Sequence, residues 1–327
     1  MATKKATIYD VAKLASVSLA TASRVINKID KVAPDTKQKV LDAIKELNYK
    51  PNSIAVELAS RKNTNVAIIV PELNYTYISH VVSGLILEAK NLGYDCLIFT
   101  TKESKNDVFK TIGKVLSLRP NGIVIFNDSL AEEELSELVD FDIPVVSLGV
   151  ELPKISSVSW HYKAQIVDLV NDALKRNKEV YFIKVEGFGR MQERMISGIK
   201  QAYLENNKKF NNVIEIKDSY KVVYQEIKEK LPTLNNCLFI ACRDSLALAA
   251  LNAALDLNLN VPQDYEFMAM IGTKYSELSR PKLSSFDIDM KGLGQEGMKA
   301  LAQIIEDNNL KVNVKLPFVY VNRGSTI

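Results

Sequence analysis

The sequence contains few of the residues that catalytic and metal sites most often use. Its 327 residues include 3 cysteines, 2 histidines and 1 tryptophan. His80 and His161 lie in unrelated stretches, with no metal-ligand spacing and no nucleophile-base pattern nearby. Glycine-rich phosphate-binding patterns such as GxGxxG and the P-loop are also absent. We therefore predict that the protein is not an enzyme and has no catalytic residues, no metal and no cofactor.

Hydrophobic runs long enough to span a membrane are absent too, and the first residues, MATKKATIYD, contain no apolar signal segment. Cys96, Cys237 and Cys242 lie in or beside apolar runs, which is typical of buried thiols in a reducing compartment. These absences predict a cytoplasmic protein with no membrane partner. They also argue against a secreted solute-binding protein.

Positive charge is concentrated near the N-terminus. Residues 1–65 carry 12 Lys+Arg against 6 Asp+Glu, whereas the remaining residues carry 30 against 33. Such an excess suits binding to phosphates, although a solvated basic surface would give the same count. The chain is also too long for one ordinary domain, and its 47% hydrophobic residues can fill substantial cores.

The stretch TIYDVAKLASVSLATASRVIN, residues 7–27, predicts two short helices joined by a tight turn. Thr7 and Asp10 form a capping-box-like start for the first helix, and Ser18 can cap the second. Apolar residues recur at helical spacing in both. A helix-turn-helix places its second helix in the major groove of DNA, but any two amphipathic helices could look similar. A third predicted helix, from Pro34 to before Tyr49-Lys50-Pro51, favours the DNA-binding interpretation.

Beyond residue 65 the chain alternates apolar runs with amphipathic stretches. This alternation predicts an α/β body with parallel sheets covered by helices. Two similar series in succession indicate two lobes with a cleft between them. The predicted strands span residues 66–70, 96–100, 122–126, 143–148, 180–185, 213–216, 237–241 and 266–271. The predicted helices span residues 78–92, 107–118, 130–139, 163–174, 190–205, 220–231, 245–257 and 291–306.

Three stretches, TIYDVAKLASVSLATASRVIN, YKPNSIAVELAS and LPFVYVNRGST, resemble the lac repressor (LacI/GalR) family of bacterial transcription regulators. The resemblance implies an all-α head over residues 1–50, a hinge helix and linker over 51–65, and a periplasmic-binding-protein-like effector and dimerisation domain over 66–327. Lobe 1 would take about 66–159 and 289–316, and lobe 2 about 160–287 and 318–327. The chain would cross between the lobes near Trp160, near 285–289 and after Leu316.

The same resemblance assigns DNA contacts to the head and hinge. Arg24 is the expected guanine or phosphate contact, with a salt bridge to a neighbouring carboxylate as the alternative. The Leu19-Ala20 opening is similar to the catabolite control branch of the family. Val56 and Glu57 depart from the arginine that is common in the hinge, so hinge binding is expected to be weaker or shifted. The expected DNA-binding residues are Thr7, Tyr9, Ser18, Leu19, Ala20, Thr21, Ser23, Arg24, Asn27, Asn52, Ala55 and Leu58, with Lys4 and Lys5 as further phosphate contacts.

A ligand cleft is implied in the body, but its residues differ from the family pattern. Gly149 and Lys274 stand where acidic or amide residues are common. Charged donors favour an anionic effector such as a phosphorylated sugar or an organic acid. The alternative is a degenerate pocket, in which Arg243 and Lys274 are exposed or paired with Asp244 and Glu277. The expected effector-binding residues are Asn74, Tyr77, His161, Arg194, Arg243, Asp244 and Lys274.

The expected function is a repressor that binds a pseudo-palindromic operator as a homodimer. No heptad tail follows Arg323, so a tetramer is not expected. Relatives in the catabolite control branch bind a phosphorylated carrier protein, but only Lys291 and Lys299 remain basic on the corresponding helix, which leaves that partner uncertain. The alternative is a regulator controlled by a protein partner or by no effector. A sugar-binding or enzymatic protein is the less favoured reading.

Overall fold

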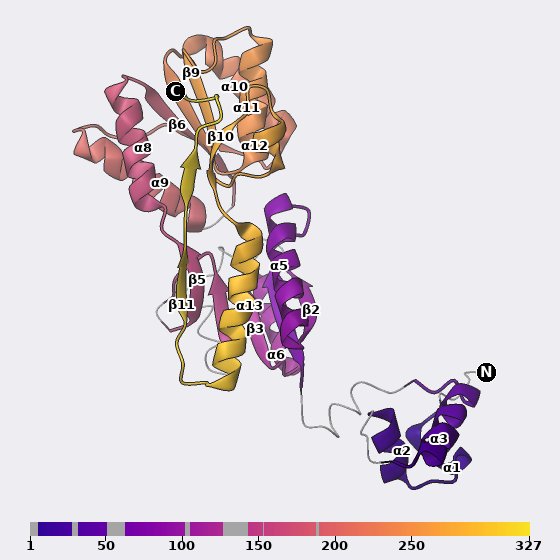
Figure 1. The fold of residues 1–327 in the computed structure, drawn as a ribbon. Helices are drawn as coiled ribbons and strands as arrows, with labels where there is room; N and C mark the ends of the chain where they lie inside the picture. The colour runs from indigo at the N-terminus through magenta and orange to yellow at the C-terminus, as the bar shows by residue number, and fades with distance from the viewer. Residues whose placement is uncertain are drawn as a thin grey trace. The chain divides into compact units, whose positions relative to one another are not determined.

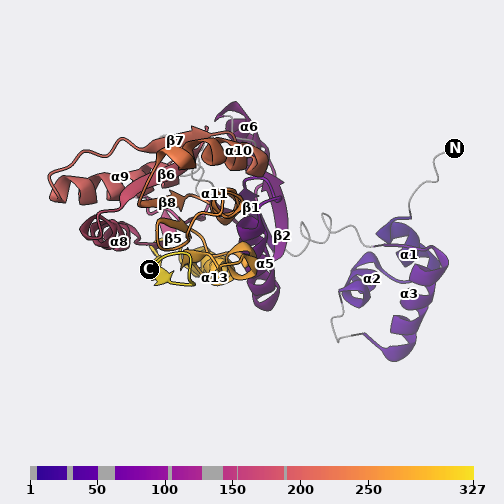
Figure 2. The same cartoon turned by 90° about the horizontal axis from the view of Figure 1, so that it is seen from above.

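The computed structural model describes residues 6–27, 32–50, 63–101, 105–126, 143–152, 154–187 and 190–327. The chain divides into two compact units, Met1–Asn63 and Thr64–Ile327, here called the head and the body (Figures 1 and 2). The predicted helices over 52–59 and 130–139 lie outside the described residues.

The head is a three-helix unit around a small apolar core. Its helices are α1 (Ile8–Leu14), α2 (Leu19–Ile26) and α3 (Pro34–Glu46). Pro34 occupies the first turn of α3, where its missing N–H costs nothing. One side chain stripe from each helix packs into a shared core made of Val11, Ala15, Val25, Val40 and Ala43. The helix-turn-helix pattern in the sequence is thus present in the structure.

Lobe 1 of the body is built on a six-stranded parallel sheet. The strand order is β11-β5-β4-β3-β1-β2, with β1 in register with β2 from Asn65↔Asp95 to Val70↔Thr100. The strands are β1 (Asn65–Val70), β2 (Asp95–Thr100), β3 (Gly122–Ile125), β4 (Val145–Leu148), β5 (Ser156–Trp160) and β11 (Asn313–Leu316). The helices are α5 (Thr76–Leu92), α6 (Lys105–Ser117) and α13 (Met290–Glu306).

Alternate residues of these strands feed two different cores. Ile68 of β1 belongs to the same buried cluster as Leu85 of α5 and Leu301 of α13. Its neighbour Ile69 belongs to the cluster that contains Ile112 of α6. Because side chains alternate across a strand, this sheet is covered on both faces, as the continuous apolar strand NVAIIV predicts.

Helices α5 and α13 cross with almost no side chain between them, and they lie side by side in both views (Figures 1 and 2). A Cβ on Gly84 would stand 2.0 Å from the Lys291 carbonyl oxygen, and one on Gly294 would stand 2.1 Å from the Val81 carbonyl oxygen. Glycine at these two positions therefore lets the backbones of the two helices touch.

Lobe 2 contains a second six-stranded sheet, of order β12-β10-β9-β8-β6-β7. Only β12 runs antiparallel to its neighbour among these pairs. The strands are β6 (Glu179–Val185), β7 (Val213–Ile216), β8 (Cys237–Ala241), β9 (Tyr265–Ala269), β10 (Ser284–Asp287) and β12 (Val319–Val321). The helices are α8 (Lys163–Lys175), α9 (Arg190–Glu205), α10 (Tyr220–Lys230), α11 (Asp244–Asp256) and α12 (Lys274–Leu278), with a 3-10 turn at Leu231–Thr233.

The chain passes between the lobes three times. The passages follow β5, β10 and β11, because each of these elements is succeeded by an element of the other lobe. Aromatic rings pack around them: the Phe318 ring lies 4.3 Å from that of Phe286 and 5.7 Å from that of Tyr162. The rings are buried, and both lobes contribute to the same core cluster.

The predicted fold class is confirmed: an all-α head and a body with two mainly parallel sheets. The sequence analysis gave no bounds for the strands β5, β10, β11 and β12 or for the helix α12. The strand β5, SSVSW, looks polar, but its serines are buried and satisfied by neighbours. Ser157 donates to Asn313 over 3.0 Å, and Ser156 accepts from the Val312 N–H over 3.0 Å. The five-residue helix α12 is too short for a periodic signal.

Within the described residues, no helix has the length and apolar character that crossing a membrane would require.

Candidate functional site

The second helix of the head presents one exposed face. Ser18 caps α2 by accepting a hydrogen bond from the Thr21 N–H over 3.2 Å. Ala22 and Val25 are buried against the other helices, so the opposite side of α2 faces solvent. The exposed residues on that side are Leu19, Ala20, Arg24 and Asn27, and Thr21 and Ser23 are half-buried. Apart from Thr7 and Tyr9, these are all the predicted DNA-binding residues that the structure describes.

Arg24 is exposed, and no carboxylate in the described part of the chain pairs with it. The alternative of a salt bridge to a neighbouring side chain therefore finds no support in those residues. The guanidinium carries five N–H donors in a planar fork, which matches the two acceptors on the edge of a guanine. Arg24 is thus available for contact with DNA.

Thr7 and Tyr9 lie at the start of α1. Thr7 accepts from the Asp10 N–H over 3.4 Å, and the Asp10 carboxylate accepts from the Thr7 N–H over 2.8 Å, which completes the predicted capping box. Tyr9 is 68% exposed, so its ring can reach a partner outside the head. The remaining predicted DNA contacts, Lys4, Lys5, Asn52, Ala55 and Leu58, lie outside the described residues.

The turn between α1 and α2 depends on Ser16, whose φ of 56° is left-handed. The Val17 N–H donates to the Ala12 carbonyl over 3.0 Å, which closes the end of α1. A serine in this conformation suffers a steric cost that glycine avoids.

Replacing Ser16 with glycine is expected to stabilise the head by up to about 1 kcal/mol, because strain relief outweighs the larger entropy of an unfolded glycine. Amide hydrogen exchange of the head residues in the full-length chain measures this gain. Ser18→Ala serves as the opposite control, since loss of the α2 cap should destabilise the head by about 1 kcal/mol. A Ser16→Gly variant with faster exchange in α1 would contradict the expectation.

A small cavity of about 90 Å³ lies between the lobes at the carboxyl ends of the strands. Lobe 1 contributes the start of α5, and lobe 2 contributes the start of α11 and the loop after β9. Four predicted effector residues meet here: Asn74, Tyr77, Arg243 and Asp244. Tyr75, Thr76, Ser245, Ile271, Thr273 and Tyr275 complete the lining. Cavities that bind drug-sized ligands are usually roughly 300 Å³ or more, so this one is small.

Arg243 is the N-cap residue of α11 and is buried, with 7% of its surface exposed. Its Nη1 forms an ion pair of 2.7 Å with Asp218, the residue that follows β7 by two positions. The guanidinium also lies 4.5 Å from the centre of the Tyr75 ring. Arg243 is therefore buried and paired with Asp218. The degenerate-pocket alternative, which expected Arg243 to be exposed or paired with Asp244, is wrong at this residue.

Asp244 links the two lobe 2 segments that line this cavity, the start of α11 and the loop after β9. Its Oδ1 accepts from the Thr273 N–H over 2.8 Å and from the Ser276 hydroxyl. Burial raises the pKa of the Asp244 carboxyl, while these hydrogen bonds oppose the rise. The carboxylate thus fixes the loop between β9 and α12. Lys274, by contrast, is exposed, with its ammonium 5.8 Å from the centre of the Tyr275 ring, and it is not among the residues lining the two cavities described here.

A second cavity of about 390 Å³ brings together the other two predicted effector residues, His161 and Arg194. Lys311 joins them, so three basic side chains face one acidic one, Glu151. The Trp160 indole Nε1 is buried and has no hydrogen-bond partner in the described part of the chain. The other lining residues are Gly149, Leu152 and Ser159.

Gly149 explains why no carboxylate enters this region from β4. Its φ is 82°, and a Cβ there would stand 3.0 Å from the Phe126 ring and 3.3 Å from the Trp160 ring. Aromatic rings thus fill the space that a longer side chain would need. A carboxylate that would accept hydrogen bonds from the hydroxyls of a neutral sugar is therefore not available at this position.

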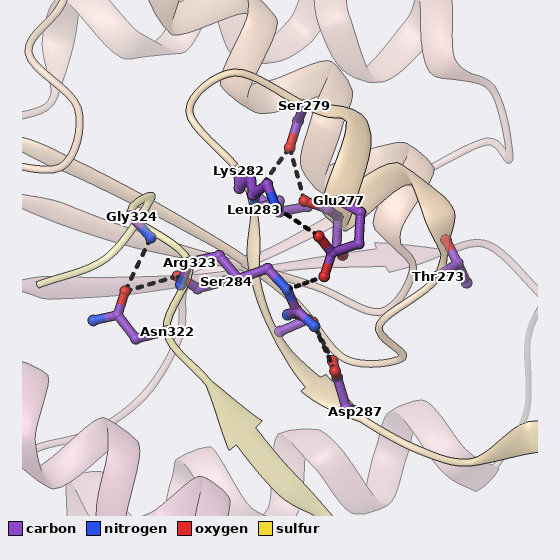
Figure 3. A network of polar contacts seen from close by, with 12 residues as sticks. Thr273, Glu277, Ser279, Lys282, Leu283, Ser284, Asp287, Asn322, Arg323 and Gly324 are labelled. Atoms are coloured by element: carbon purple, nitrogen blue, oxygen red, sulfur yellow. Dashed lines mark hydrogen bonds and ion pairs between the residues drawn. The ribbon is translucent and has the colours of Figure 1, made fainter.

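The loop after β9 is also held from the side of the C-terminal tail (Figure 3). Arg323 donates to Glu277 of α12 over 2.9 Å and to Ser285 over 2.6 Å, and it forms an ion pair with Asp287. Glu277 pairs in turn with Lys282 over 2.9 Å. The hydrogen bonds from Lys282 and Arg323 lower the pKa of Glu277. Glu277, which the sequence analysis offered as a partner for the cleft cations, belongs to this network instead.

The sequence analysis missed Tyr75, Asp218 and Lys311. Asp218 carried a usable signal, because polar residues just after a parallel strand face the ligand side of an α/β sheet. Tyr75 and Lys311 carried no such signal. No group of His, Cys, Asp and Glu within the described ranges could hold a metal ion.

Comparisons with known proteins give matches to both the head and the body. A family model described as bacterial regulatory proteins, lacI family, matches residues 7–52, and one described as a periplasmic binding protein-like domain matches residues 182–326. Catabolite control protein A of Staphylococcus epidermidis is 29% identical over 329 residues, covering 98% of this chain and 99% of that protein. Its counterpart in Staphylococcus xylosus is 29% identical over 326 residues, with the same coverage.

Solved structures share the fold. A lac repressor dimer bound to operator and the anti-inducer ONPF matches with a TM-score of 0.87 at 23% identity, covering 99% of this chain and 100% of that chain. The regulator CelR in complex with cellobiose matches with a TM-score of 0.66 at 22% identity, covering 98% and 99%. The named relatives are regulatory proteins rather than enzymes. The head of this chain thus matches the lacI family of bacterial regulatory proteins, residues 182–326 match a periplasmic binding protein-like domain, and the chain as a whole is similar to catabolite control protein A.

Proposed function

We propose that the protein is a repressor whose two heads bind the half-sites of a pseudo-palindromic operator. The observation that carries this proposal is the exposed face of α2, where Leu19, Ala20 and Arg24 point away from the core of the head. In a helix-turn-helix such a face meets base edges, while α1 and its neighbours contact phosphates. A lac repressor dimer of similar fold is known bound to its operator.

Selection of bound sequences from a random duplex pool, at physiological salt, tests this function. We expect an inverted repeat to be enriched, because a symmetric dimer reads two half-sites in opposite directions. A pool that shows no inverted repeat after selection by the full-length protein would exclude the proposed function. Salt must be held constant across the rounds, since phosphate contacts make affinity strongly salt-dependent.

The proposed dimer surface is an apolar patch on lobe 1. Ile86 and Leu87 of α5 are 43% and 41% exposed, and Ile98 of the edge strand β2 is 39% exposed. Leu92, at the end of α5, extends the patch. An edge strand with exposed apolar side chains usually needs a partner, and a second copy supplies the same patch across a two-fold axis.

Replacing Leu87 with glutamate is expected to shift the protein to monomers and to weaken dimerisation by about tenfold or more, since an isologous contact would bring two carboxylates together. Sedimentation analysis over a dilution series measures this. Leu204→Glu is the matched control, because Leu204 is 75% exposed on lobe 2 and should change nothing. Equal effects of the two changes would mean that the patch on lobe 1 is not the dimer surface.

The proposed effector is a small anion held in the larger cavity by Arg194, His161 and Lys311. Charged donors bind phosphate or carboxylate oxygens more strongly than neutral hydroxyls. The buried Trp160 Nε1 adds a donor that an oxygen of the ligand would satisfy. CelR of similar fold binds cellobiose, a neutral sugar, so calorimetry should compare sugar phosphates with cellobiose. Preferential binding of cellobiose would contradict the anionic ligand.

The alternative is a regulator that needs no small ligand. The involvement of Arg243 with Asp218 and Tyr75 favours it, because this cation of the smaller cavity already has an anionic partner in the protein. Lys299, one of the two basic residues on α13, pairs with Glu296 over 2.7 Å. Absence of any heat with sugar phosphates or sugars would support this alternative.

A further inference from the structure

Three side chains meet across the gap between the lobes and contact one another in every pairing. The Tyr75 hydroxyl, from lobe 1, donates to Asp218 Oδ2 of lobe 2 over 2.7 Å. Arg243 Nη1 donates to the same Oδ2, also over 2.7 Å. The Arg243 guanidinium lies 4.5 Å from the centre of the Tyr75 ring, which is cation–π distance. One oxygen thus ties a tyrosine of one lobe to an arginine of the other.

On the lobe 2 side the arginine is shielded from water, whereas the carboxylate is partly open to it. Arg243 is 7% exposed, and the side chain of Asp218 is 29% exposed. The salt bridge lies wholly within lobe 2, so it survives if the lobes separate. If the lobes separate, only Tyr75 moves away from the ion pair. Tyr75 then loses both its charge-assisted hydrogen bond to Asp218 and its cation–π contact with Arg243. Burial and the hydrogen bond to Asp218 raise the pKa of Tyr75 to about 12, so the phenol remains a donor at neutral pH.

The Tyr75 ring continues into an aromatic series within lobe 1. It stacks on Tyr77 with 5.8 Å between ring centres, and Tyr77 meets the edge of Phe126 at 6.3 Å. Phe126 in turn covers Gly149 beside Trp160. Tyr75, Tyr77 and Arg243 line the smaller cavity, whose volume is only about 90 Å³.

We propose that Tyr75, Asp218 and Arg243 form an interlobe clasp, which holds the two lobes closed without a small ligand. Two of its residues, Tyr75 and Arg243, line the smaller cavity, whereas the proposed effector site is the larger one. For regulation, this rests on the proposed repressor function: a closed body fixes the dimer in one arrangement, and any effector must work against the clasp.

Tyr75→Phe is the main test, because it removes the hydroxyl and keeps the ring. The protein offers a matched control within a single lobe: Tyr224 donates to Asp256, and Lys228 lies 5.0 Å from the centre of the Tyr224 ring. Tyr224→Phe therefore removes the same type of bond without touching the gap between the lobes. Far-UV circular dichroism of both variants establishes that they are folded.

Two readouts report on closure without DNA. Small-angle scattering of the full-length protein measures its size, and acrylamide quenching reports on Trp160, the single tryptophan, which is buried and lines the larger cavity. We expect Tyr75→Phe to raise the Trp160 quenching constant about twofold or more and to enlarge the particle, while Tyr224→Phe matches the wild type. Asp218→Ala combined with Tyr75→Phe should add little to either change alone, because the residues act as one unit.

A Tyr75→Phe protein with wild-type quenching and wild-type size would overturn the clasp. So would additive effects of the two substitutions, since independent contacts add. Failure of the repressor proposal is distinguishable: a protein without any preferred inverted repeat would lack the function, yet these DNA-free measurements would still decide whether the clasp exists.

Discussion

An Arg24→Ala variant of the full-length protein is expected to bind each half-site of its selected operator about tenfold to a hundredfold more weakly, with a much smaller loss on random duplex. The guanidinium is exposed on α2 and has no carboxylate partner in the described residues. A bidentate contact from arginine to guanine contributes roughly 1–3 kcal/mol of discrimination per half-site, which corresponds to this range. Competition binding with both duplexes at one salt concentration measures the two losses together.

Lys45→Ala is the matched control for Arg24→Ala. Lys45 is exposed on α3 of the same head and carries the same charge, but it lies outside the α2 face. Its removal should weaken both duplexes to a similar and small extent, since it changes only the overall attraction to phosphates. If Arg24→Ala also weakens both duplexes equally, Arg24 contacts phosphate and does not select the sequence.

Substitution of Gly294 by alanine is expected to destabilise the body by about 3 kcal/mol or more, which is large for a single methyl group. The added Cβ would stand 2.1 Å from the Val81 carbonyl oxygen and 2.8 Å from the Leu85 amide nitrogen. Both atoms are backbone, so no rotamer change can relieve the overlap, and α5 must separate from α13. Urea unfolding followed by circular dichroism measures the loss.

Gly113→Ala is the control, because this glycine lies in α6 with nothing within 4 Å of an added Cβ. There the alanine should stabilise the protein by about 0.5–1 kcal/mol through helix propensity. The same chemical change is therefore expected to act with opposite sign at the two positions. A Gly294→Ala protein as stable as the wild type would mean that the two helices pack less tightly than described here.

The fold was largely predictable because its elements carry strong periodic patterns. The head follows from the spacing of apolar residues and from caps such as Thr7 and Ser18, which the structure reproduces. The strand β5 could not be predicted in the same way. Its serines look like a loop until Asn313, more than a hundred and fifty residues away, supplies the hydrogen-bond partner.

The residues of the cleft were predictable only in part, because their contacts too join distant parts of the sequence. The sequence indicates which residues follow the strands, and Arg243 and Asp244 were found in this way. It does not indicate which of them meet across the lobes: Tyr75 and Asp218 are separated by 143 positions. Nor does it give the path of the loop after β9, which Asp244 and the Arg323 network fix and which leaves Lys274 in solvent.

The packed rings of Phe286, Phe318 and Tyr162 limit how far the body can move. They lie in or beside the strands that connect the lobes and form part of a core shared by both. A wide swing would expose this aromatic surface to water at considerable cost, so only a modest rotation that keeps the rings in contact is affordable. Any change that a ligand causes within the body must therefore depend on small angular shifts between its lobes.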